Sequence, residues 1–372
     1  MENDKSIVFI SPVHWNYYPY RDQELPSSIA ERGYPCIYLN PVRYKGSEKS
    51  TRFAQVNKRN YHKNIQIIDR MSKWRKSLVE LIYENFLNVR AIKKFRPYVV
   101  ISSDHLMSLG VCIYCKFKKT KFVFDVTDNW ELVDKSPAGI VYKLILKPLL
   151  ARFSFAVTCT SHRQFNYFKG RRKSNTFLIS NGINPRILEQ LNKQDNKLLP
   201  VNEVNFIGSL RDWYDFDLLL EIFKQFPDIE LNIYGQGPLY PELLAKASPI
   251  PNIHIHGNIE NLKTPGILLR SLFGILPLKV NELNHSTCPI KLFDYWGASK
   301  AVISTPVEEV KRVGGDSLLY ASNKEEFINA INKLLDNRKL SLKLGMEGRQ
   351  KIDNMHNYIT IADQFLQILN KP

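Results

Sequence analysis

Short apolar segments that alternate with helical segments constrain the fold of this chain more than any other feature. The apolar segments are mostly four to six residues long and rich in Val, Ile and Phe, and the segments that follow several of them carry apolar residues at helical spacing. They lie at residues 7–11, 36–40, 98–102, 121–126, 156–159, 231–234, 273–277 and 301–304. Strands that are apolar on both faces are typical of parallel sheets covered by helices. The pattern therefore predicts an α/β fold with parallel sheets.

The length of the chain and one polar segment predict two domains. A chain of 372 residues is longer than a single hydrophobic core normally serves. Residues 192–200, N-K-Q-D-N-K-L-L-P, are polar and charged and end in proline, as linkers often do. We therefore predict domains at 1–191 and 201–357, with a separate final helix within 358–372. The first domain opens as a strand-loop-helix-strand unit but lacks G-x-G-x-x-G, so no bound dinucleotide is expected.

The positive charge of the chain is concentrated in its first half. Residues 1–200 hold 34 Lys and Arg against 16 Asp and Glu, whereas the remainder holds 18 against 20. A basic domain can bind nucleic acid, an anionic membrane surface or an acidic substrate, or it can simply keep the protein in solution. The basic residues are spread out and no nucleic-acid-binding module is recognisable, so nucleic acid is not expected. Two basic amphipathic stretches, 70–96 and 140–153, are either core helices or elements that dock on an anionic bilayer.

Features of secretion and of metal chemistry are weak in this sequence. The N-terminus leads directly into a strand without a charged segment followed by a long apolar one, and no apolar run reaches the ~18 residues of a spanning helix. We therefore expect a cytoplasmic protein. The lone C-x2-C of Cys112 and Cys115 has no second pair, so buried free thiols are expected rather than a zinc site.

The segment from Ser286 to Pro306 carries the clearest chemical signal. It predicts a loop, a short helix with Thr287 as its N-cap, and a buried strand at 301–304. A helix start directs free N–H groups and a positive dipole end at an anion, and Lys291 adds a positive charge in the first turn. Asp294, one turn further on, can accept hydrogen bonds from sugar hydroxyls. These residues predict a nucleotide diphosphate site, although an amphipathic helix leading into a core strand is the alternative.

This segment also resembles a known family. The run P-I-K-L-F-D-Y-W-G-A-S-K-A-V-I-S-T is similar to P-x-K-x-(F/Y)-E-Y-x-A-x-G-K-P-V-V-(A/S)-T of bacterial glycosyltransferases of the GT-B fold. These are family 4-like enzymes that build polysaccharides and teichuronic-type polymers. Asp294, Ser299 and Ala301 depart from the family's usual Glu, Gly and Pro, and Ser286 stands where many relatives carry a second glutamate. The resemblance implies two Rossmann-like parallel-sheet domains facing across a cleft, with the C-terminal helix crossing back to the first domain.

The resemblance also implies which residues bind the donor. The strand and Gly-Ser turn before residue 210, the G-Q-G-P turn after residue 234 and the strand exit at residue 258 match family segments near the donor phosphates and base. With the segment from Ser286 onward, the implied donor-binding residues are Gly208, Ser209, Arg211, Tyr234, Gly235, Asn258, Ile259, Ser286, Thr287, Cys288, Lys291 and Asp294. Relatives often carry Arg and Lys after this Gly-Ser turn; Arg211 corresponds to the Arg and no matching Lys follows, so the resemblance implies that Lys291 carries most of the phosphate charge.

Residues of the first domain are expected to bind the acceptor. D-V-T-D-N-W resembles the family's Y-D-x-x-D-(D/E), which places Asp128 at the position of a possible base, although a helix cap is the alternative. An aromatic loop follows the first strand, at the sheet edge where open α/β sheets bind ligands. Its rings either stack on a sugar or form a covering lid. The expected acceptor-binding residues are His14, Trp15, Tyr17, Arg21 and Asp125.

The function implied is glycosyl transfer. A sugar would move from a nucleotide diphosphate sugar, with UDP as the expected nucleotide, to a hydroxyl of a saccharide or lipid-linked saccharide in cell-surface polysaccharide synthesis. No D-x-D motif is obvious, so neither a metal ion nor another cofactor is expected. Whether the reaction retains or inverts the anomeric configuration stays open. The alternatives are a nucleotide-sugar epimerase of the same fold, a basic nucleic-acid-binding protein and a non-catalytic protein.

Overall fold

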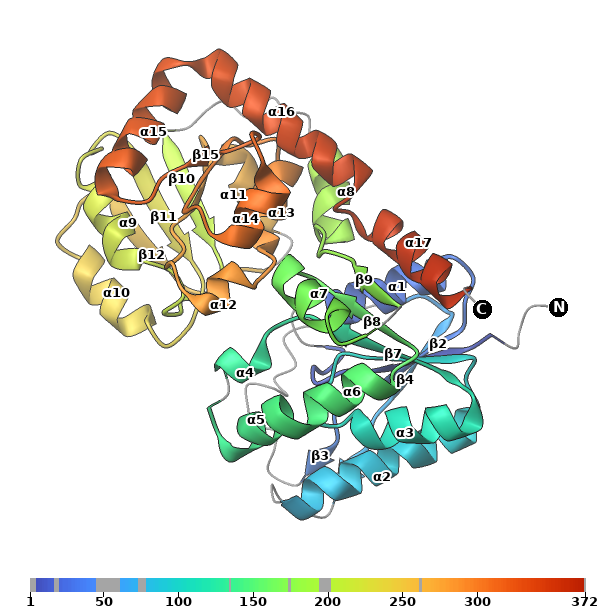
Figure 1. The fold of residues 1–372 in the computed structure, drawn as a ribbon. Coiled ribbons are helices and arrows are strands. Elements are labelled where there is room, and N and C mark those ends of the chain that lie inside the picture. Colours follow the sequence, from blue (N-terminus) through green and yellow to red (C-terminus); the bar gives the residue numbers. More distant parts are fainter. Residues whose placement is uncertain are drawn as a thin grey trace. The chain divides into compact units, whose positions relative to one another are not determined.

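The computed structural model describes residues 5–16, 20–44, 61–72, 78–133, 135–172, 175–193, 202–260 and 263–370. The chain divides into two compact units: the first contains residues 1–180 and 358–372, and the second contains residues 181–357. Figure 1 shows both units as α/β structures. The division falls before the predicted linker at 192–200, because helix α8 (Pro185–Lys193) packs on helices of the second unit. Residues 194–200 of that linker lie outside the described residues.

The first unit is built on a seven-stranded sheet in which every pairing is parallel. Its strand order is β4-β2-β1-β6-β7-β8-β9. The strands are β1 (Ile7–Ile10), β2 (Cys36–Leu39), β4 (Ile65–Ile68), β6 (Val99–Ser102), β7 (Lys121–Val126), β8 (Ala156–Cys159) and β9 (Thr176–Leu178). β3 (Arg43–Tyr44) and β5 (Met71–Ser72) form a separate parallel pair. The central strands are buried on both faces, which explains their uninterrupted apolar sequences.

Helices cover both faces of this sheet. α1 (Arg21–Glu31) and the C-terminal α17 (Tyr358–Leu369) pack on one face, and their apolar residues share one core with β1, β2 and β6. The other face packs against α2 (Leu78–Phe95), α3 (Leu109–Lys118), α6 (Lys147–Phe153) and α7 (His162–Lys169). α4 (Trp130–Val133), α5 (Pro137–Val141) and a π-helical turn, η3 (Tyr142–Leu146), lead into α6. Figure 1 shows the two helical layers on opposite sides of the sheet.

The second unit contains two parallel three-stranded sheets around one core. The strands are β10 (Glu203–Ile207), β11 (Glu230–Tyr234) and β12 (Ile253–His256) in one sheet, and β13 (Gly274–Leu276), β14 (Val302–Ser304) and β15 (Leu319–Tyr320) in the other. The helices are α8, α9 (Phe216–Phe223), α10 (Tyr240–Ala247), α11 (Thr264–Arg270), α12 (Glu282–His285), α13 (Ile290–Gly297), α14 (Glu308–Gly314), α15 (Lys324–Asp336) and α16 (Arg338–Asn354).

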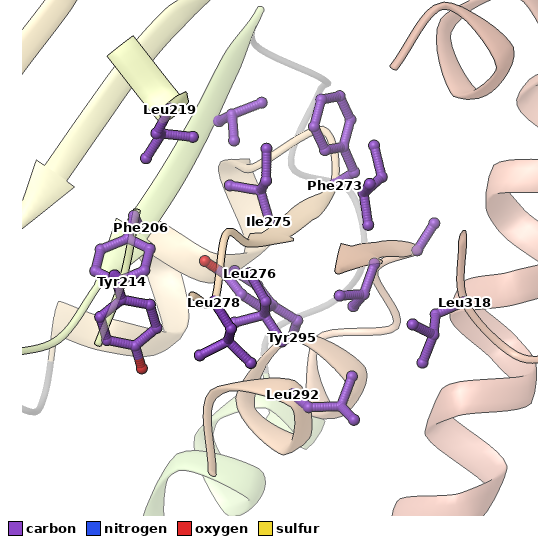
Figure 2. Close-up of a cluster of buried hydrophobic side chains, with 14 of the residues drawn as sticks. Phe206, Tyr214, Leu219, Phe273, Ile275, Leu276, Leu278, Leu292, Tyr295 and Leu318 are labelled. Atoms are coloured by element: carbon purple, nitrogen blue, oxygen red, sulfur yellow. The ribbon is translucent and has the colours of Figure 1, made fainter. Parts of the chain in front are cut away.

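Helix α13 is anchored in the middle of this core. Leu292 and Tyr295 of α13 are fully buried and lie in one cluster with Phe206, Ile275 and Leu318, as Figure 2 shows. The Tyr295 hydroxyl also donates a hydrogen bond of 2.8 Å to the carbonyl oxygen of Asn205 in β10. The apolar face of α13 therefore fixes the helix, while its first turn is free to serve a site at the carboxyl ends of the strands.

Candidate active site

Three glycine-containing turns are stacked at the carboxyl ends of β10, β11 and β12. The amide of Gly208 donates to the carbonyl of Tyr234 at 2.9 Å, and the amide of Gly235 donates to the carbonyl of Gly257 at 3.1 Å. The backbones approach so closely that a Cβ atom built at Gly235 would lie 1.9 Å from the carbonyl oxygen of Gly208. Only glycine fits there, so the turns present bare backbone at the sheet edge.

The Lys291 side chain reaches from the first turn of α13 across the Gly208 turn. A Cβ atom at Gly208 would lie 2.1 Å from both Cε and Nζ of Lys291. The ammonium group is 4.9 Å from the ring centroid of Tyr214 and 5.4 Å from that of Phe206, so the two rings face the cation. The structure thus brings together two residues, Gly208 and Lys291, that were predicted to bind the same diphosphate.

The prediction that Thr287 caps α13 is wrong. Pro289 is the N-cap residue and makes no side-chain capping bond. The Thr287 hydroxyl donates to the carbonyl of Leu283 at 2.8 Å, and the Ser286 hydroxyl is 2.9 Å from that carbonyl and from the carbonyl of Glu282. The reason is the short helix α12: its last carbonyl oxygens have no donors within the helix and accept hydrogen bonds from these hydroxyls. The α13 N-terminus is left without a side-chain cap.

Asp294 lies one turn further along α13 and is partly buried. Burial raises the pKa of its carboxyl group to about 6, although the charge of Lys291 acts in the opposite direction. Cys288, also predicted near the donor, is buried in the core of the second unit. Lys291 and Asp294 are therefore the two charged side chains that α13 contributes to this region.

A stacked pair of rings stands at the ends of β11 and β12. The rings of Tyr234 and His256 are 4.4 Å apart with an interplanar angle of 13°, and the parallel register places the two residues side by side. Burial lowers the pKa of His256, which keeps its ring neutral. Asn258 and Ile259 follow directly after β12. His256 was missed in the sequence, although the alternation I-H-I-H beside Tyr234 could have indicated it.

Two further predicted donor residues lie at the rim of the Gly208 turn. Ser209 is partly buried. Arg211 is exposed, and its guanidinium lies 5.3 Å from the ring centroid of Trp213. Neither side chain has a contact with Lys291 that defines its role, so both roles stay predictions.

A group of carboxylates lies at the carboxyl edge of the sheet in the first unit. Burial and the charge of Asp22 raise the pKa of Asp128 to about 6. Asp22 accepts hydrogen bonds from the hydroxyls of Ser103 and Ser11, and burial raises its own pKa. Asp22 also borders a cavity of about 10 Å³, with room for about one water molecule, together with Ser11 and Ser103. Sequence reasoning missed Asp22 because it reads as an ordinary acidic residue in the first turn of a helix.

Arg21 and Asp125 form a buried ion pair in the structure. The Arg21 guanidinium contacts both carboxylate oxygens, with N–O distances of 2.8 and 3.1 Å, and each side chain is 3 % exposed. The Thr158 hydroxyl donates to the same carboxylate at 2.7 Å. These groups join α1 to β7 and β8, so the geometry favours a structural role over the predicted acceptor contact.

The predicted aromatic platform is also packed inside the first unit. Trp15 is 1 % exposed and lies edge-on to Tyr38 at 4.9 Å, within the core beneath α1. His14 is buried, and its Nε2 lies 3.1 Å from the side-chain amide of Asn40. Neither ring has a face exposed for stacking on a sugar, because burying apolar surface away from water stabilises the fold. Tyr17 lies outside the described residues.

Comparisons with known proteins agree with this geometry. Residues 211–367 match the model of a family described as glycosyl transferase-like. Over 212 residues the chain is 27% identical to the putative teichuronic acid biosynthesis glycosyltransferase TuaH of Bacillus subtilis, a match that covers 51% of this chain and 52% of TuaH. The match thus spans about half the length of that curated relative.

Solved structures with the same fold extend over nearly the whole chain. Sucrose-phosphate synthase from Thermosynechococcus elongatus superposes with a TM-score of 0.73 at 14% identity and covers 98% of both chains. HepE of Anabaena in complex with UDP-glucose superposes with a TM-score of 0.71 at 13% identity and covers 98% of this chain and 99% of its own. The fold is that of the GT-B glycosyltransferases. The GT-B fold expected from the sequence is confirmed.

The described residues were also compared with the requirements of a metal site and of a membrane-spanning helix. No group of three or more His, Cys, Asp or Glu side chains there could hold a metal ion. All five cysteines are buried and form no disulfide, in agreement with the buried thiols predicted for Cys112 and Cys115. Within the same residues, no helix combines the length and apolar character needed to cross a bilayer.

Proposed function

We propose that this GT-B protein transfers a sugar from a nucleotide diphosphate sugar to a hydroxyl group of a saccharide or lipid-linked saccharide during synthesis of a cell-surface polysaccharide. UDP is the expected nucleotide. The observation that carries the proposal is the position of Lys291, whose ammonium group lies over the Gly208 turn from the first turn of α13. A cation, bare backbone and an uncapped helix N-terminus together suit a diphosphate.

The same groups would assist the reaction. When the bond between the sugar and the diphosphate breaks, negative charge develops on the departing phosphate oxygen. Lys291 and the N–H groups of α13 would stabilise that charge without a metal ion. Asp294, one turn along, would accept hydrogen bonds from the ribose hydroxyls, and the flat face of Tyr234 and His256 lies beside the strand exit expected to contact the base.

Asp128 would act as the general base if the reaction inverts the anomeric carbon. Its pKa of about 6 makes the carboxylate predominant at neutral pH and still basic enough to accept a proton from the acceptor hydroxyl. If the reaction retains configuration, no such base is required. The activity of an Asp128→Asn variant separates these cases: loss of at least a hundredfold in kcat supports the base, and a change below threefold excludes it.

We also propose that the protein works in the cytoplasm, peripherally bound to the inner face of the cell membrane. The support is the excess of basic residues in positions 1–200, which favours an anionic surface. Such an arrangement would bring the first unit close to a lipid-linked acceptor. The surface that would make this contact is derived below.

A thermal-shift screen against UDP, GDP, ADP and their sugars tests the donor site. A ligand at 100 times its Kd should add roughly 2.7 kcal/mol to the free energy of unfolding, a shift that is easily measured. We expect one nucleotide diphosphate to stabilise the wild type and to stabilise Lys291→Ala and Asp294→Ala far less. If no nucleotide stabilises the protein, or if the variants respond as the wild type does, the proposed donor site is wrong.

A further inference from the structure

One helical layer of the first unit exposes an unusual number of large apolar side chains. α3 packs against both α2 and α6, and the inner sides of these helices form one core with the sheet. Figure 1 shows this layer on the side of the sheet opposite α1 and α17. The outer helical surface, as we call it, is formed by α2, α3 and the continuous helix α5–η3–α6. Its most exposed apolar side chains are Ile82, Phe86, Phe117, Ile140, Leu144 and Ile145.

The degree of exposure makes this surface distinct from ordinary surface hydrophobics. Phe117 is 82 % exposed, Ile82 is 71 % exposed and Leu144 is 67 % exposed. Single exposed apolar side chains are common on proteins, but a set spread over three packed helices marks an interaction surface. The layer therefore needs a partner that accepts apolar side chains.

The π-helical turn explains how the last helix presents its apolar residues. Tyr142 and Lys147 lie at the two ends of this turn and are both buried. The Lys147 ammonium pairs with Glu131 and lies 4.0 Å from the ring centroid of Tyr167. Because the wider turn sets equivalent inward positions five residues apart, with four residues between them, Leu144 and Ile145 both point outward. An α-helical turn would bring one of them back toward the core.

The exposed charge described around these apolar residues is mainly basic. The exposed charged side chains described on the layer, including Lys119 at the end of α3, are all basic: Arg90, Lys93, Lys94, Lys116, Lys118, Lys119, Lys143 and Arg152. Among the described side chains of the three helices, the acidic Glu84 is only partly exposed. Apolar side chains interspersed with basic ones complement an anionic lipid interface, which offers acyl chains and phosphate groups side by side.

We propose that the outer helical surface docks on an anionic phospholipid bilayer, with the apolar side chains in the interface and the basic ones on the lipid phosphates. The proposal rests on the peripheral membrane association proposed above and specifies the surface responsible. Neither signal would suffice alone, because stable binding to a bilayer normally requires apolar insertion together with a polybasic patch.

Co-sedimentation with vesicles tests this surface without requiring any enzymatic activity. The full-length protein is mixed with vesicles of phosphatidylcholine alone or with 30–40% phosphatidylglycerol, at about 0.1 M and 0.5 M salt. Two variants remove the two signals: Leu144→Glu with Ile145→Glu, and Lys118→Glu with Lys143→Glu and Arg152→Glu. We expect binding only to the anionic vesicles, weakened at the higher salt and reduced at least tenfold in both variants.

Matched controls come from the second unit, where α16 exposes Leu342 and Met346 at a similar level. Leu342→Glu with Met346→Glu, and Lys311→Glu with Lys333→Glu and Lys339→Glu, make equal changes in polarity and charge. These variants should bind vesicles within twofold of the wild type. Thermal unfolding of each variant checks that it is folded.

Several outcomes would overturn the proposal. Equal binding to neutral vesicles, no binding to either kind, or equal losses in the control variants would each contradict docking through this surface. Self-association in the absence of lipid, abolished by Leu144→Glu with Ile145→Glu in sedimentation velocity, would assign the surface to a second copy of the chain instead. Because nucleotide binding is measured separately in the second unit, failure of vesicle binding leaves the proposed donor site standing.

Discussion

Lys291 and Asp294 place two opposite charges one helical turn apart in α13. Lys291 reaches over a glycine turn between two rings, while Asp294 is held where burial disfavours its charge. A carboxylate with these surroundings costs stability unless a ligand supplies donors to it. The cost is an observable property of the protein without ligand, and it leads to the first prediction.

Asp294→Asn should stabilise the protein at neutral pH. The pKa of Asp294 in the folded chain is about 6, above the ~4 of an unfolded aspartate. Between these values the folded state binds more protons than the unfolded state, so the free energy of unfolding falls as pH rises through this range. Asparagine removes this loss, and we expect a gain of about 1 to 2 kcal/mol at pH 7.5 with little change at pH 4. Urea unfolding at both pH values measures it, and a gain that is the same at both would contradict the account.

At the scale of residues, the sequence predicts side chains well when helical spacing determines their position. Lys291 and Asp294 lie where the spacing of α13 places them. The burial of Trp15 and of the Arg21–Asp125 pair was not predictable because their environment depends on segments far away in the chain, such as Tyr38 and Thr158. Asp22 escaped notice for the same reason: its partner Ser103 is 81 residues further along the chain.

At the scale of elements, the stacked turns after β10 and β11 depend on the absence of side chains. Gly235 has a φ of +148° and faces the backbone of Gly208, which has no flexible atoms that could move aside. Gly266, by contrast, lies inside α11 with no other atom within 4 Å of the position of a Cβ. The two glycines therefore form a natural pair for comparison.

Gly235→Ala should destabilise the protein by about 2 kcal/mol or more and weaken nucleotide binding, because the Gly208 turn must shift. Gly266→Ala is the control and should raise stability by about 0.5 to 1 kcal/mol, as expected for alanine in a helix. Denaturant unfolding of both variants measures the difference. Equal effects of the two substitutions would show that the turns are not as closely packed as described.

Elements were predictable where their periodicity is strong, and less so where they end or change register. The predicted strands lie close to their observed positions because each is a short apolar run between polar residues, whereas β3, β4 and β5 were not predicted. The first basic amphipathic stretch contains β5 (Met71–Ser72) and α2 (Leu78–Phe95), and its residues 73–77 lie outside the described residues. The π-helical turn was not predictable, because it depends on the burial of Lys147 against Glu131 and Tyr167.

At the scale of the whole molecule, the first unit is completed by the end of the chain. Phe365 of α17 is fully buried in the core that contains β1 and α1, and the Arg21 guanidinium lies 5.3 Å from its ring centroid. The sequence contains the helix, but its return to the first unit came only from the resemblance to GT-B proteins. The apolar spacing of a helix shows that one face is buried, but it does not show which distant part of the chain covers that face.

Phe365→Ala should lower the stability of the first unit by about 3 to 5 kcal/mol, because a large buried ring is replaced by a cavity. Ile359→Ala on the exposed side of the same helix is the control and should change stability by less than about 0.5 kcal/mol. Unfolding followed by tryptophan fluorescence measures both. A loss for Phe365→Ala no larger than for the control would mean that α17 is not part of this core.

The proposed glycosyl transfer depends on binding of a nucleotide diphosphate to the second unit through Lys291. Calorimetric titration of the wild type, Lys291→Ala and Lys333→Ala with UDP, and with GDP and ADP in parallel, tests it most directly. Lys333 is an exposed lysine on α15 and controls for the loss of one positive charge. We predict that one nucleotide binds the wild type and Lys333→Ala with equal Kd and binds Lys291→Ala at least tenfold more weakly, about 1.4 kcal/mol. Absence of binding by all three nucleotides, or equal affinity of Lys291→Ala and the wild type, would contradict the claim.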